Sequence, residues 1–172
     1  MFENRIKAGE VLSRKLLKFK SIKDAFVLAI PRGGVVIGKV VSDTLGIPLG
    51  VVYAKKIPTP GQPELAAGAY IVRDKKFGKT PNVKDKNVIL ADDGIATGAT
   101  TRAAIKYLRA KKVKKIILAV PVAPKDAIKD LRLLVDKIVV LETPDDFSSV
   151  GQFYRDFPQV TDKEVVKLLK SD

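Results

Sequence analysis

Five short segments of this chain are apolar almost from end to end, and they strongly limit how the chain can fold. They are residues 25–30, 49–54, 87–91, 115–120 and 137–141. Stretches with the apolar spacing of helices surround them, at about residues 7–20, 35–45, 98–110, 125–134 and 161–169. Apolar strands that alternate with helices indicate a parallel β-sheet covered on both faces. We therefore expect an α/β fold with a central, mainly parallel sheet.

The length and composition fit a single domain. The chain has 172 residues, 46% of them hydrophobic, which is enough for one core. We expect this core over about residues 1–141 and a small C-terminal part over about 142–172, where aromatic residues become frequent. Thr161 and Glu164 have the spacing of a capping box, which predicts the start of the last helix.

The segment between the second and third apolar strands has a different character. Residues 55–61 contain two prolines and a glycine, which predicts a mobile loop. We expect a short strand at residues 66–72 and a polar turn at residues 74–81. The regular alternation of strands and helices resumes at residues 87–91.

The composition excludes several kinds of chemistry. The chain has no cysteine and no histidine, so disulfides, thiolate nucleophiles, imidazole bases and the usual zinc sites are excluded. Any reaction must use carboxylates, lysines, hydroxyl groups, backbone amides and hard cations. The longest apolar stretch, residues 116–124, is far shorter than the roughly 20 residues of a membrane-spanning helix, and the first residues lack a signal-peptide core. We expect a cytoplasmic protein without a membrane partner.

The net charge of +13 predicts attraction to polyanions. The partner could be a nucleic acid, a membrane surface or a small phosphorylated ligand, and charge alone does not choose among these three. Much of the charge is equally well explained by solvated lysines on the outer faces of helices.

The most informative segment is the junction of an expected strand and helix at residues 88–101, VILADDGIATGATT. Ligands of open parallel sheets collect beyond the carboxyl ends of the strands, where Asp92 and Asp93 fall. The two glycines that follow permit a tight backbone with exposed amides, and the threonines add hydroxyl groups at the start of a helix. A phosphate cradle beside two carboxylates suits a sugar phosphate with Mg²⁺. The alternative is an acidic turn whose aspartates cap the helix.

This junction resembles the motif with which type I phosphoribosyltransferases bind 5-phosphoribosyl 1-pyrophosphate (PRPP). The resemblance implies a type I phosphoribosyltransferase fold, with helices on both faces of the sheet and a small C-terminal hood. It implies that Asp92 and Asp93 hold the ribose 2′- and 3′-hydroxyls and, through these or water, a Mg²⁺ ion. The implied 5′-phosphate site comprises Gly94, Ile95, Ala96, Thr97, Gly98, Ala99 and Thr100.

A second match lies at the end of the first apolar strand, in Pro31-Arg32-Gly33-Gly34. Read alone, it is a turn whose glycines serve backbone geometry. In the family, the corresponding loop binds pyrophosphate through amides exposed by an unusual peptide geometry. The resemblance implies a pyrophosphate site at Arg32, Gly33 and Gly34, with the Arg32–Gly33 bond as the candidate for a non-proline cis peptide.

Lys55 and Lys56 follow the second apolar strand and fall at the same edge of the sheet. Either could neutralise a leaving pyrophosphate, or both could be solvated. The next residues resemble the flexible loop of the family, which closes over the substrate. Pro60, Gly61 and Glu64 belong to this loop, and Glu64 could instead form a local salt bridge.

The resemblance spans nearly the whole chain and is greatest to a poorly assigned group of phosphoribosyltransferases. Its acceptor does not carry over, because the hood varies most within the superfamily. The 6-oxopurine enzymes have an acid where this chain has Ala96, which argues against a hypoxanthine or guanine acceptor. The C-terminal aromatic residues Phe147, Phe153, Tyr154 and Phe157 could stack on a base or form a small core.

The resemblance implies an enzyme that transfers the 5-phosphoribosyl group of PRPP to a nitrogen acceptor, a nucleobase or a related heterocycle, with Mg²⁺ as cofactor. Catalysis would depend on Asp92, Asp93, Lys55 and Arg32. One alternative is a PRPP-sensing regulator that binds nucleic acid, although the segment before residue 25 leaves little room for a DNA-binding element. Another is a phosphoribosyl-binding hydrolase or phosphorylase. Because oligomers are common in the family, the resemblance also implies a homodimer.

Overall fold

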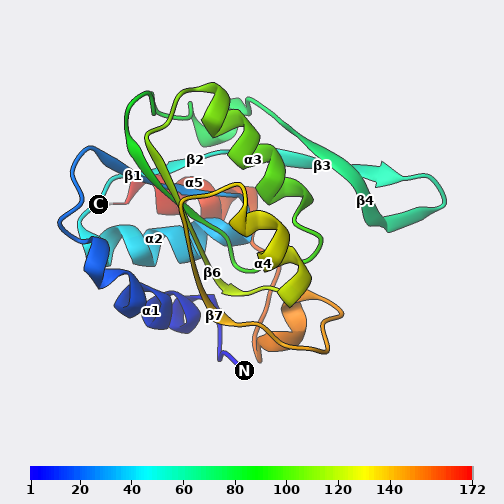
Figure 1. Ribbon diagram of the computed structural model, residues 1–172. Coiled ribbons are helices and arrows are strands. Elements are labelled where there is room, and N and C mark those ends of the chain that lie inside the picture. Colours follow the sequence, from blue (N-terminus) through cyan, green and yellow to red (C-terminus); the bar gives the residue numbers. More distant parts are fainter. Residues whose placement is uncertain (172) are drawn as a thin grey trace.

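The computed structural model describes residues 1–171, with only the backbone of residues 59 and 62–67. A five-stranded sheet with the order β2-β1-β5-β6-β7 forms its centre. All of its neighbouring strands are parallel, which confirms the expected α/β architecture (Figure 1). These strands are β1 (Ala25–Ala29), β2 (Leu49–Val51), β5 (Asn87–Ala91), β6 (Lys115–Val122) and β7 (Lys137–Glu142).

Helices cover both faces of this sheet. The helices are α1 (Arg5–Leu16), α2 (Gly33–Leu45), α3 (Ala99–Ala110), α4 (Lys125–Arg132) and α5 (Asp162–Lys170). Short 3-10 turns are η1 (Leu17–Phe19), η2 (Lys75–Phe77) and η3 (Val150–Phe153). No helix in the described part of the chain is both long and apolar enough to span a membrane.

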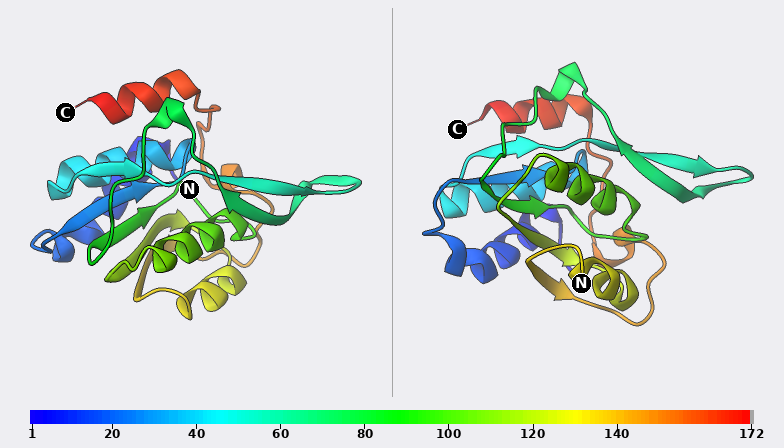
Figure 2. Two further views of the ribbon diagram at one scale, coloured as in Figure 1. Left: turned by 90° about the horizontal axis from the view of Figure 1, so that it is seen from above. Right: turned by 45° about the horizontal axis from the view of Figure 1, so that its top comes forward.

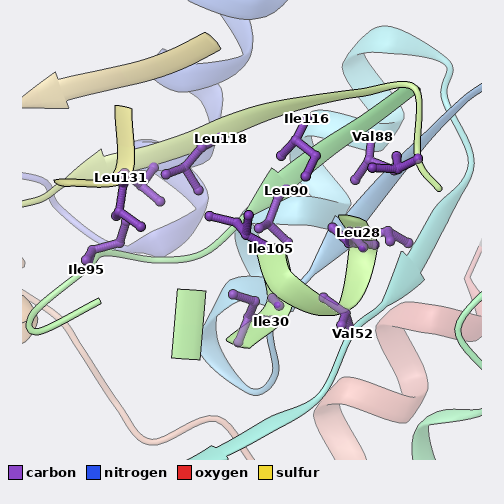
Figure 3. Packing of buried hydrophobic residues seen from close by; sticks show 14 of the residues in the cluster. Leu28, Ile30, Val52, Val88, Leu90, Ile95, Ile105, Ile116, Leu118 and Leu131 are labelled. Carbon is purple, nitrogen blue, oxygen red and sulfur yellow. The ribbon is translucent and has the colours of Figure 1, made fainter. Parts of the chain in front are cut away.

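Alternate residues of each central strand point into two different apolar layers. Leu28 of β1 and Leu90 of β5 pack with Ile105 of α3 and Leu131 of α4 (Figure 3). Their strand neighbours point the other way, toward α1 and α2, as Ile89 does. Because these strands are buried on both faces, their sequences are apolar throughout rather than alternating.

A two-stranded antiparallel hairpin projects from this body (Figures 1 and 2). It consists of β3 (Ala54–Thr59) and β4 (Gln62–Ile71). Residues 55–59 are therefore a strand where we expected a loop, and the expected strand at residues 66–72 corresponds to the second half of β4. The register shifts on both sides of Pro58. Proline is compatible with such an irregular edge because the ladder there does not need its missing N–H.

The first residue of the chain lies beside the end of β7, where its amino group is 3.5 Å from Glu142 Oε1. At the other end of the described chain, α5 packs on α2. Phe2 N donates to Phe153 O at 2.7 Å, and Arg155 N donates to Phe2 O at 2.8 Å. The first residues therefore run alongside the segment that precedes α5. That helix starts with the predicted capping box, in which the Thr161 side chain accepts from Glu164 N and the Glu164 carboxylate accepts from Thr161 N.

Candidate functional site

A cleft of about 500 Å³ lies at the carboxyl ends of β1 and β5. The loop between β5 and α3 forms its floor, and Gly98 takes the left-handed conformation, with φ of 82°, just before α3 begins. The predicted motif at residues 88–101 and the turn at residues 31–34 therefore meet in the same cleft. The described residues that line the cleft are Arg5, residues 30–33, residues 53–56, residues 92–101, Val150 and Phe157.

The two aspartates of the motif lie against the glycines of the turn. A Cβ atom on Gly33 would overlap the Asp93 carboxylate, and one on Gly34 would lie 2.9 Å from Asp92 Oδ1. Asp93 N donates a hydrogen bond of 2.8 Å to Asp92 Oδ1. The acidic pair and the turn can share one cleft only because residues 33 and 34 have no side chains.

Burial and the neighbouring charge act on Asp92. Removal from water raises the pKa of the Asp92 carboxyl well above its usual value, and the negative charge of Asp93 raises it further. The positive charge of Lys56 acts in the opposite direction and lowers this pKa. A cation that binds beside Asp92 would have the same effect, because it favours the ionised carboxylate.

The carboxylate pair suits a hard cation that is shared with a substrate. Mg²⁺ binds through one or two carboxylates together with water and phosphate oxygens. Among the side chains that the structure describes, which exclude Glu64, no cluster of three or more acidic groups could hold a metal by itself. Asp92 and Asp93 therefore fit a Mg²⁺ ion that receives most of its ligands from water and from a bound phosphate compound.

The turn before α2 contains a cis peptide bond between Pro31 and Arg32. The prediction of a cis bond at Arg32–Gly33 is therefore wrong by one residue. The glycine at position 33 has a different physical reason, since it makes room for the carboxylate of Asp93. The resemblance thus predicted correctly that this turn contains a non-proline cis peptide bond, but it placed that bond one residue too late.

Arg32 reaches the rim of the cleft, where α5 holds it. Its Nε donates to Asp162 Oδ1 at 2.6 Å, and Lys76 Nζ donates to Asp162 Oδ2 at 3.2 Å. The hydrogen bond to Asp162 raises the pKa of Arg32, and the same bond, followed by that of Lys76, lowers the pKa of Asp162. The predicted pyrophosphate contact is therefore already paired with a carboxylate of the C-terminal helix.

Lys55 and Lys56 both line the cleft, from the first residues of β3. They pair with Tyr70 and Ala69 of β4, and both side chains are exposed. The other predicted loop residues are farther along the hairpin. Pro60 and Gly61 form its turn and are absent from the described lining of the cleft, and the side chain of Glu64 lies outside the described residues.

Tyr154 belongs to the buried core and Phe147 and Phe153 are partly buried against it, and these three are absent from the described lining of the cleft. Phe147 and Phe153 stack on each other, with ring centroids 5.2 Å apart. Tyr154 is 5% exposed, and its hydroxyl donates to the backbone oxygen of Asp93 at 2.6 Å. Burial raises the pKa of Tyr154. Of these four C-terminal aromatic residues, Phe157 is the one that lines the cleft, and its ring stacks on that of Tyr154 with the centroids 4.8 Å apart.

Sequence reasoning missed Arg5, which lines the cleft from the first turn of α1. Its Nε donates to Asp93 Oδ2 at 2.8 Å, and its Nη1 donates to Pro158 O at 2.7 Å. Its guanidinium carbon lies 3.7 Å from the ring centroid of Phe157. The expected helix began at residue 7, so no local pattern pointed to Arg5, which is 88 residues away from Asp93.

Comparison with known proteins agrees with this geometry. The chain matches the family described as "Phosphoribosyl transferase domain" over residues 3–158. It is 34% identical to a Mycobacterium tuberculosis protein named "Putative phosphoribosyl transferase", over 98% of this chain and 46% of that protein. The chain thus spans about half the length of the curated relatives it matches.

Solved structures show the same architecture. The crystal structure of TT1426 from Thermus thermophilus superimposes with a TM-score of 0.82 at 31% identity, covering 98% of this chain and 97% of that one. A purine phosphoribosyltransferase from Pyrococcus horikoshii gives a TM-score of 0.61 at 22% identity, covering 91% and 93%, and shows the fold alone. Because the family match covers most of its length, this chain belongs to the phosphoribosyl transferase domain family.

Proposed function

We propose that this protein binds PRPP with Mg²⁺ and transfers its phosphoribosyl group to a nitrogen acceptor, with release of pyrophosphate. One observation carries the proposal. The turn at Gly33 and Gly34 touches the carboxylates of Asp92 and Asp93, so a pyrophosphate site and a ribose site would lie side by side in one cleft. The family supports the same reaction class.

The cleft offers a separate group for each part of PRPP. The 5′-phosphate would lie in the loop at residues 94–100, where backbone amides and the N-terminus of α3 favour an anion. Asp92 and Asp93 would orient the ribose hydroxyls. Arg32 and the two lysines would face the pyrophosphate, and Lys56 is the stronger candidate because its charge already acts on Asp92.

In the proposed reaction the bond between ribose C1 and the pyrophosphate oxygen breaks as an acceptor nitrogen attacks C1. The ribose ring gains positive charge, and the bonding electrons leave with pyrophosphate. Mg²⁺ would neutralise charge on the departing oxygens. The protein would contribute position and electrostatics, with carboxylates below the cationic ribose and cations at the leaving group. A proton on the attacking nitrogen would pass to a pyrophosphate oxygen or to water, so no strong base is required of the chain.

The acceptor would enter where the C-terminal segment meets the cleft. Val150 and Phe157 line this part and provide apolar surface for a flat heterocycle. Ala96 places no acid there, which disfavours a 6-oxopurine. We propose residues 142–172 as the hood, with Phe157 rather than Phe147, Phe153 or Tyr154 as its aromatic contact with the acceptor.

Isothermal titration with PRPP tests this function. Wild-type protein should bind PRPP more tightly with Mg²⁺ than without it, and the Asp92→Asn/Asp93→Asn variant should lose this magnesium-dependent binding. The matched control is Asp126→Asn/Asp130→Asn, which removes two exposed carboxylates from α4. A screen for pyrophosphate release would then identify the acceptor. Wild-type protein that does not bind PRPP would contradict the proposal.

A further inference from the structure

Arg5 joins three segments that are distant in the sequence. It is only 8% exposed, although it is the first residue of a surface helix. One guanidinium group contacts the Asp93 carboxylate of the β5–α3 loop, the Pro158 carbonyl and the Phe157 ring of the C-terminal segment. We propose that Arg5 is a positioning residue that orients Asp93 toward the ribose and holds the segment at residues 154–158 over the acceptor end of the cleft.

This inference rests on the proposed function and assigns a different partner to each carboxylate oxygen of Asp93. Arg5 occupies Oδ2 at 2.8 Å. Arg5 is the one cationic partner of this carboxylate in the described part of the chain, and it leaves Oδ1 as the oxygen to meet a ribose hydroxyl. Tyr154 fixes the backbone of the same residue, since its hydroxyl donates to Asp93 O at 2.6 Å. Asp93 is thus held at both ends.

The arrangement needs arginine rather than any cation. Arg5 uses Nε, Nη1 and the flat face of the guanidinium at the same time, for a carboxylate, a carbonyl and an aromatic ring. A lysine ammonium can approach one of these partners but cannot present a planar fork and a stacking face together. Replacing Arg5 with lysine should therefore weaken PRPP binding, although the positive charge is kept.

Burial separates this pair from an ordinary surface ion pair. The side chains of Arg5 and Asp93 are 9% and 14% exposed, whereas those of Lys7 and Glu10 on the same helix are 54% and 42% exposed. Exposed pairs contribute little, while removal of one partner from a buried pair leaves the other charge without compensation. Arg5, Asp93 and Phe157 also all line the cleft. The buried pair is therefore placed to act on a ligand.

A double-mutant cycle on PRPP affinity tests the inference. The four proteins are wild type, Arg5→Met, Asp93→Asn and the double variant, titrated with PRPP in the presence of Mg²⁺. Each single change should weaken binding by roughly 10- to 100-fold, as for residues that orient a ligand group. The double variant should lose less affinity than the product of the two single losses, because both changes remove the contact between Arg5 and Asp93. Lys7→Met should bind like wild type.

Losses that multiply in the double variant, or Arg5→Met protein that binds like wild type and only melts at a lower temperature, would overturn the inference. If Arg5→Met does not fold, Arg5→Lys carries the test, because it keeps a cation beside Asp93. Arg5→Lys should still bind several-fold more weakly than wild type, and full affinity would overturn the inference. These outcomes presuppose that wild-type protein binds PRPP, and its failure to bind would overturn the proposed function as well.

Discussion

At the scale of single residues, the space beside the acidic pair is the tightest feature of the cleft. Gly33 stands where any Cβ would collide with the Asp93 carboxylate. A Cβ atom on Gly34 would lie 2.9 Å from Asp92 Oδ1 and 3.0 Å from the backbone oxygen of Ala91, which is closer than Cβ atoms normally approach. Added atoms at such positions force their neighbours to move, and here the neighbours are the side chains that would hold the ribose.

Gly33→Ala should therefore remove PRPP binding and lower the free energy of unfolding by about 1–3 kcal/mol, the usual cost of overpacking. Titration with PRPP and chemical denaturation would measure the two effects. The matched control is Gly68→Ala in β4, where Ile57, at an ordinary 3.7 Å, is the one described residue that an added Cβ would meet. A Gly33→Ala protein that binds PRPP like the control would contradict this account of the cleft.

Single residues also show where sequence reasoning ends. Asp92, Asp93 and the loop after them could be placed in the cleft because strand, acids, glycines and helix follow one another without a break. Arg5 and Asp162 could not be found in this way. Each contacts the site across more than 80 residues of chain, and each looks locally like an ordinary charge in the first turn of a helix.

At the scale of elements, periodicity was a good guide wherever an element is buried. The five parallel strands and five helices formed at the expected places, with ends that moved by at most four residues. It failed at β3, because that strand belongs to an exposed hairpin and has no apolar pattern. The prolines at positions 58 and 60 favoured a loop, although backbone pairing with β4 keeps β3 extended.

The contact between α5 and the turn before α2 gives a prediction at this scale. Asp162 is paired with Arg32, and under the proposed function this pairing would compete with the binding of pyrophosphate by Arg32. Asp162→Asn should therefore tighten pyrophosphate binding by roughly 2- to 5-fold, in keeping with the modest strength of exposed ion pairs. Calorimetric titration with pyrophosphate measures this change, and Asp43→Asn, which breaks the exposed pair with Lys39, is the control. Weaker binding by Asp162→Asn would show that Asp162 instead supports the site.

At the scale of the whole molecule, the protein carries far more positive charge than the cationic side chains of the cleft account for. The net charge is +13, whereas four cationic side chains line the cleft in the described part of the chain. Most of the charge is spread over exposed lysines of helices and loops. Such a distribution attracts polyanions without recognising them.

Single-stranded RNA should therefore bind weakly, with a dissociation constant of roughly 10⁻⁴ to 10⁻⁶ M, and binding should fall steeply as salt rises. Fluorescence anisotropy with two RNAs of unrelated sequence, each at low and physiological salt, measures both properties. Similar affinity for the two RNAs is the expected result. Tight binding that distinguishes them and responds to PRPP would favour a PRPP-sensing regulator over the transferase.

The hydrogen bonds that Arg5 and Tyr154 donate to Asp93 also have a consequence for folding during synthesis. Its side-chain partner Arg5 precedes it by 88 residues, and its backbone partner Tyr154 follows it by 61. Contacts of such long range form late, because a large loop must close before they are gained. A nascent chain can build β1, β5 and the motif loop and still lack a fixed Asp93 until residue 154 has left the ribosome. Ligand-binding competence should thus appear as one of the last steps of folding, well after the sheet that supports it.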